Sequence, residues 1–83
     1  MLNQALYKDS RIEIQQVNDK LYCKWDSPQK INHSYMLAKL SEVIGNLFPG
    51  SWPVKSFEEA EKHRGMRCFI IEQKGDVIFA RWI

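Results

Sequence analysis

The sequence predicts a small α+β domain in the order ββααββ, with an antiparallel four-stranded sheet as one layer and two helices packed mainly on one of its faces. Three observations lead to this class. Residues 11–26 alternate in polarity as a hairpin does, residues 34–48 carry apolar side chains at helical spacing, and residues 68–83 form a second, more apolar hairpin. We expect a single domain, 1–83, in which residues 1–10 form a flexible or packing tail or a short helix.

The first hairpin is predicted to turn at Asn18 and Asp19, residue types that tolerate a positive φ. On its core side this register places Ile12 opposite Trp25, Ile14 opposite Cys23 and Gln16 opposite Leu21. On its other side it places Arg11 opposite Asp26, Glu13 opposite Lys24 and Gln15 opposite Tyr22. Facing opposite charges are typical of a solvated surface. One face of this hairpin should therefore be buried and the other exposed.

Residues 34–48 predict an amphipathic helix that covers the sheet. Its apolar stripe consists of Met36, Leu37, Leu40, Val43, Ile44, Leu47 and Phe48. Ser34 or Asn32 is expected to cap its start, and Pro49 with Gly50 should end it.

A shorter helix is predicted to follow Ser56, which forms a capping box with Glu59. Acidic residues gather at its start and basic ones at its end, in agreement with the helix dipole. Gly65 fits the position after that end. We expect the segment between the helices, residues 50–54, to be a loop stiffened by prolines, on which Trp52 is either a partner contact or a plug for the core.

The second hairpin is predicted to turn at Lys74 and Gly75. One of its faces is wholly apolar and consists of Phe69, Ile71, Ile78, Ala80 and Trp82. The other face carries Cys68, Ile70, Val77 and Phe79 at its centre and Glu72 and Arg81 at its rim, with Ile70 opposite Phe79 and Glu72 opposite Val77. A second apolar face is unusual for a sheet with helices on one side only.

Apolar side chains on that second face would forgo several kcal/mol in water, at about 25 cal/mol per Å², so we expect something to cover them. The candidates are the N-terminal segment with Leu2, Leu6 and Tyr7, a second copy of the chain, or another protein.

From this patch we predict a non-enzymatic protein-interaction domain, acting as a homodimer or as a small adaptor or inhibitor of a larger protein machine. The expected contact residues are Ile70, Val77, Phe79, Arg81 and Trp52. Phe79→Glu should then leave the protein folded and weaken its association, whereas unfolding would mark Phe79 as core. A domain of this size still offers an interface of about 800 Å².

Nucleic-acid binding is the alternative. The expected contact residues are Lys62, Arg64 and Arg67, next to His63 at the end of the second helix, together with the aromatic ring of Tyr22. Trp25 and Trp82 fall on predicted core faces and are not expected to contribute. Salt-sensitive binding of single strands would favour this alternative.

Other function classes find little support. No nucleophile with a base, paired carboxylates or glycine-rich phosphate loop is legible, so we expect no enzyme and no cofactor. The spacing of Cys23, His33, His63 and Cys68 does not match a zinc site, and both cysteines are expected to stay reduced. Apolar runs are too short to span a bilayer, and no secretory signal is visible, so a cytoplasmic protein is the expectation.

Overall fold

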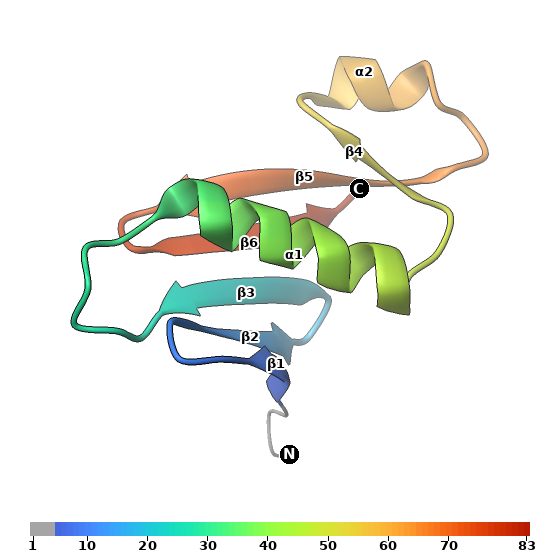
Figure 1. Ribbon diagram of the computed structural model, residues 1–83. Coiled ribbons are helices and arrows are strands. Elements are labelled where there is room, and N and C mark those ends of the chain that lie inside the picture. Colours follow the sequence, from blue (N-terminus) through green and yellow to red (C-terminus); the bar gives the residue numbers. More distant parts are fainter. Residues whose placement is uncertain (1–4) are drawn as a thin grey trace.

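The computed structural model describes residues 5–83 as an α+β fold in which a long helix crosses one face of a six-stranded mixed sheet (Figure 1). The elements are β1 (Ala5–Lys8), β2 (Ile12–Val17), β3 (Lys20–Trp25), α1 (His33–Leu47), β4 (Ser51–Val54), α2 (Phe57–Glu61), β5 (Arg67–Lys74) and β6 (Val77–Trp82). The strand order is β1-β2-β3-β6-β5-β4. All neighbours are antiparallel except β4 and β5, which run parallel. The α+β class is confirmed. The predicted four-stranded antiparallel sheet is matched only in part, because β2, β3, β6 and β5 form it but β1 and the parallel strand β4 extend it to six strands.

The core lies between α1 and the middle of the sheet, because α1 packs mainly on β3 and β6. Its buried side chains are Met36, Leu40, Val43 and Ile44, which face Ile12, Ile14, Leu21, Cys23, Ile78 and Ala80. Asn32 caps the helix by accepting a 3.0 Å hydrogen bond from the Tyr35 amide, as predicted. Leu37 and Leu47 are 44% and 50% exposed, so the expectation that the whole stripe is covered is wrong at these two positions.

The first hairpin has the predicted register. Ile12 pairs with Trp25 and Glu13 with Lys24, and Asn18 in the turn has a φ of 58°. The Glu13 carboxylate and the Lys24 ammonium are 3.9 Å apart on the side of the sheet away from α1.

Within the described part of the N-terminal segment, Ala5–Lys8 form a strand rather than a tail or a helix. β1 pairs with β2 at one edge of the sheet, and Leu6 and Tyr7 pack against the core. They do not cover the second hairpin, because β2 and β3 separate β1 from β6. Leu2 lies outside the described residues. At four residues β1 is too short to show a clear period of two.

The segment between the helices is also a strand. β4 pairs in parallel with β5, with Trp52 beside Cys68 and Pro53 beside Phe69. Proline cannot donate to a sheet ladder, but an edge strand tolerates it. The sequence does not predict β4 as a strand, because β4 has only four residues and one of them is proline.

The second hairpin turns at Gly75 and Asp76, one residue later than predicted, and Gly75 has a φ of 62°. The shift follows from turn geometry, since the favoured two-residue turns need a positive φ at their first position. Pairing therefore moves by two residues, so that Ile70 faces Arg81 and Glu72 faces Phe79. Side chains alternate with a period of two, so both predicted faces keep their residues while the cross-strand neighbours change.

The second helix is shorter than predicted and does not share the core. Ser56 accepts a hydrogen bond from the Glu59 amide at 3.2 Å, which confirms the predicted cap. The helix ends at Glu61, none of its residues is buried, and its contacts are with β4. The prediction of two helices packed on one face is therefore wrong, because five residues are too few to present an apolar stripe to the sheet.

A carboxylate ties the β1–β2 turn to α1. Asp9 accepts hydrogen bonds from the hydroxyls of Tyr7 and Tyr35 and from the amides of Arg11 and Ile12. Desolvation raises the pKa of Asp9, but the four hydrogen bonds together outweigh it and hold that pKa well below its ordinary value. The same contact with Asp9 raises the pKa of Tyr35 to about 12.

We predict that Asp9→Asn lowers the melting temperature at neutral pH by about 5 °C, the shift expected when a domain of this size loses about 1 kcal/mol. Because the folded state lowers the pKa of Asp9, its stabilisation is complete above the unfolded pKa of about 3.9 and is lost as the pH falls toward the folded pKa. The variant should therefore lose less stability than the native protein on acidification below about pH 4. Circular dichroism melts across this pH range measure both effects. Asp26→Asn, at an exposed carboxylate, is the control, and equal behaviour of the two variants would contradict the role of Asp9.

Candidate binding groove and open sheet face

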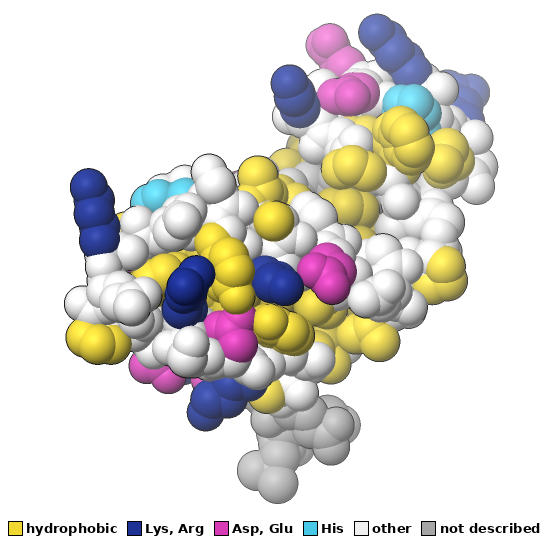
Figure 2. Space-filling view, viewed as in Figure 1, with side chains coloured by type: hydrophobic (Ala, Val, Ile, Leu, Met, Phe, Trp, Pro, Cys, Tyr) yellow, Lys and Arg dark blue, Asp and Glu magenta, His cyan; other side chains and the backbone are white. Residues whose placement is uncertain are grey.

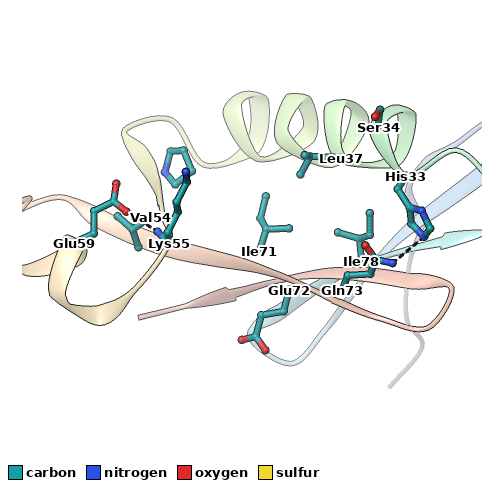
Figure 3. A pocket seen from close by; sticks show the side chains of 11 residues that line it. His33, Ser34, Leu37, Val54, Lys55, Glu59, Ile71, Glu72, Gln73 and Ile78 are labelled. Carbon is teal, nitrogen blue, oxygen red and sulfur yellow. Dashed lines mark hydrogen bonds between the residues drawn. The ribbon is translucent and has the colours of Figure 1, made fainter.

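A groove of about 570 Å³ lies between α1 and the segment of β4 and α2, above β5 and β6 (Figure 3). One wall is formed by His33, Ser34 and Leu37 of α1, the other by Pro53, Val54, Lys55 and Glu59, and the floor by Ile71, Gln73 and Ile78. Glu72 borders the groove, but its side chain points away from it (Figure 3).

The groove exists because one helix is narrower than this sheet. A helix is about 10 Å wide and strands lie about 4.8 Å apart, so α1 covers little more than two strands. Those strands are β3 and β6. Leu37 on the margin of α1 is 44% exposed, and Ile71 below it is only partly buried. The space between Leu37 and Ile71 is thus apolar and open to solvent.

Polar groups mark the two ends of the groove. At one end the His33 Nε2 and Gln73 Nε2 atoms are 3.0 Å apart, within hydrogen-bond distance. At the other end a Glu59 carboxylate oxygen accepts a hydrogen bond of 2.8 Å from the Lys55 amide. An apolar middle with polar ends is typical of a site that orients its ligand.

Further apolar side chains are exposed on the lobe formed by residues 51–66 (Figure 2). They are Trp52, Phe57 and Met66, with exposed fractions of 44%, 60% and 43%. The Trp52 ring lies 5.2 Å from the His63 ring, centroid to centroid. Trp52, a predicted contact residue, is therefore accessible on edge strand β4.

The other predicted protein contacts lie on the sheet face opposite α1, which we call the open face. Ile70, Val77, Phe79 and Arg81 share it, but all are only partly exposed. The predicted apolar centre is interrupted, because Arg81 sits beside Ile70 and forms an ion pair of 2.8 Å with Glu72, next to Phe79. Trp52 on β4 lies two strand positions from Val77, Phe79 and Arg81 on β6, with Ile70 on β5 between them.

The four residues predicted for nucleic-acid binding do not form one surface. Lys62 and Arg64 lie in the turn that follows α2. Arg67 stacks 4.5 Å from the Trp82 ring, on the side of the sheet that faces α1. Tyr22 lies on the open face, where its ring is 5.5 Å from that of Phe79.

Sequence reasoning missed the groove, since it assigned Leu37 and Ile71 to the core. Both residues have the spacing of core positions, and no sequence signal reports the width of the sheet relative to the helix. The two short edge strands, which widen the sheet, were themselves missed.

Both cysteines are free and buried, and burial raises the pKa of the Cys23 thiol to about 11. Residues 5–83 contain no group of three or more metal-ligating side chains. No helix among them is long and apolar enough to cross a membrane.

No family model, curated protein or solved structure matches this chain.

We predict that Leu37→Glu shifts the melting temperature by less than about 5 °C, because a carboxylate at this open position stays hydrated. Leu40→Glu, one turn along the same helix, should abolish folding, since Leu40 is fully buried and the new charge would have no partner. Circular dichroism melts of the two variants measure the difference. Unfolding of Leu37→Glu would show that the groove is closed in solution.

Proposed function

We propose that this protein is a non-enzymatic protein-binding domain whose groove receives an amphipathic helix of a partner. The observation that carries the proposal is the exposure of Leu37 above Ile71, in an apolar groove with polar ends. Such a domain acts as an adaptor or as an inhibitor of a larger protein.

The dimensions of the sheet support a helix as the occupant. Packed helices lie about 8–10 Å apart, which equals about two strand spacings. With α1 over β3 and β6, the next helix position lies over β5 and β4, where the groove is. Apolar residues spaced three and four apart on the partner helix would contact Leu37, Ile71 and Val54.

The surroundings of the groove supply the rest of an interface. Its polar ends can pair with polar residues that flank the apolar stripe of the partner. One end carries His33 and Gln73, and the other carries Lys55 and Glu59. The exposed lobe places Trp52 near this region, and tryptophan is enriched among residues that dominate binding energy.

Self-association through the open face stays a prediction. It has less support than the groove, because the ion pair of Arg81 with Glu72 and the side chain of Lys20 lie among its apolar residues. Charged residues are depleted at the centres of protein interfaces.

We predict that peptides selected from a library with apolar residues at helical spacing bind the protein, whereas a library with alternating apolar residues yields no binders. Leu37→Glu should weaken the selected peptides by about tenfold or more, as expected for a central contact. Leu47→Glu is the matched control. Leu47 lies on the same helix and is similarly exposed, but it is about 15 Å away and does not line the groove.

Three results would contradict this function. Binders could come only from the alternating library, or their affinity could be unchanged by Leu37→Glu. In the third case, light scattering would find a dimer that Phe79→Glu dissociates and Leu37→Glu leaves intact, which would place association on the open face instead.

A further inference from the structure

The open face has an ordered arrangement of side chains in cross-strand rows. The central row runs Gln15, Tyr22, Phe79, Glu72 across β2, β3, β6 and β5. The row on one side runs Lys8, Glu13, Lys24, Val77, Lys74, and the row on the other side runs Val17, Lys20, Arg81, Ile70. Aromatic rings thus lie at the middle of the face, with basic residues on both sides of them.

The aromatic pair sits on the two central strands of the sheet. The Tyr22 and Phe79 rings are partly exposed, 5.5 Å apart between centroids, and inclined by 32°. The Lys20 ammonium lies 5.9 Å from the centre of the Phe79 ring. Since α1 packs on the opposite side, the sheet offers these rings to a ligand that can stack on them.

Positive charge exceeds negative charge on this face. Its basic strand residues are Lys8, Lys20, Lys24, Lys74 and Arg81, and its acidic ones are Glu13 and Glu72. Each acidic side chain is already paired with a basic one, Glu13 with Lys24 and Glu72 with Arg81. The protein as a whole is close to neutral, so the surplus is a local property of the open face.

We propose that the open face binds single-stranded nucleic acid. Bases stack on Tyr22 and Phe79, and the basic residues of this face that no acidic partner neutralises, Lys8, Lys20 and Lys74, contact phosphates on either side of them. A single strand fits better than a duplex, because its unstacked bases expose the faces that aromatic rings contact. The site shares Tyr22 with the nucleic-acid surface expected from the sequence. Its basic residues are those of the open face and not those at the end of α2.

The proposal does not depend on the groove, which lies on the other side of the sheet. Leu37→Glu should leave nucleic-acid binding unchanged, so failure of either proposal can be told from failure of the other. A partner helix in the groove and a strand on the open face could be bound together.

The experiment is fluorescence anisotropy with three labelled probes: oligo(rU), oligo(dT) of the same length, and a DNA duplex. We expect both single strands to bind more tightly than the duplex at low salt. If three phosphates are neutralised, the logarithm of the binding constant should fall with the logarithm of salt concentration with a slope of about −2. The ratio of affinities for oligo(rU) and oligo(dT) then assigns RNA or DNA as the ligand.

Variants separate stacking from charge. Tyr22→Leu and Phe79→Leu keep apolar volume but remove the ring, and each should weaken binding about fivefold or more. The double variant Lys20→Gln with Lys74→Gln removes two of the basic residues that have no acidic partner and should make the salt slope shallower by about 1.4. Lys62→Gln with Arg64→Gln removes the same charge from the turn after α2 and should bind nearly as the native protein does.

Binding of no single strand at low salt would overturn the proposal. So would native affinity in a folded Phe79→Leu variant, checked by circular dichroism. A larger loss in the Lys62 and Arg64 double variant than in the Lys20 and Lys74 one would also overturn it, by moving the contact surface to the lobe.

Discussion

The packing of α1 on the two central strands is the contact on which the rest of the structure depends. Met36, Leu40 and Ile44 bury almost completely against Leu21 and Ala80, while the edges of the sheet contribute little to this core. Among the described residues, α1 alone is long enough to bury an apolar stripe, because α2 has only five residues. The sheet, at about five strand spacings of 4.8 Å, is much wider than that helix.

This mismatch produces two accessible surfaces with different chemistry. Beside α1, on the core side, the floor of the groove is apolar because Ile71 continues the face that the helix covers elsewhere. On the opposite side, long polar side chains share the sheet with apolar ones, and the ion pair of Glu72 with Arg81 interrupts the apolar surface. The first surface suits an apolar partner, whereas the second suits a charged ligand that can stack on rings.

Sequence reasoning succeeded where signals are local. Asn18 predicted the first turn and its register correctly. Asn32 and Ser56 were predicted as helix N-caps, and both cap a helix. It failed for β1 and β4, because four-residue edge strands have too few positions for periodicity and one contains Pro53. The second hairpin shows an intermediate case. Misplacing its turn by one residue kept every side chain on the right face but paired Ile70 with the wrong neighbour. The groove was out of reach, since it depends on how many strands the sheet has.

The openness of the groove is tested most directly by measuring how accessible Leu37 and Ile71 are in the free protein. A soluble paramagnetic probe speeds the relaxation of methyl protons that solvent can approach. We predict strong relaxation of the Leu37 methyls, a clear effect on Ile71, and almost none on fully buried Ile14. If Leu37 and Ile71 are instead as protected as Ile14, the chain itself or a second copy already fills the space beside α1, and the groove is not a binding site.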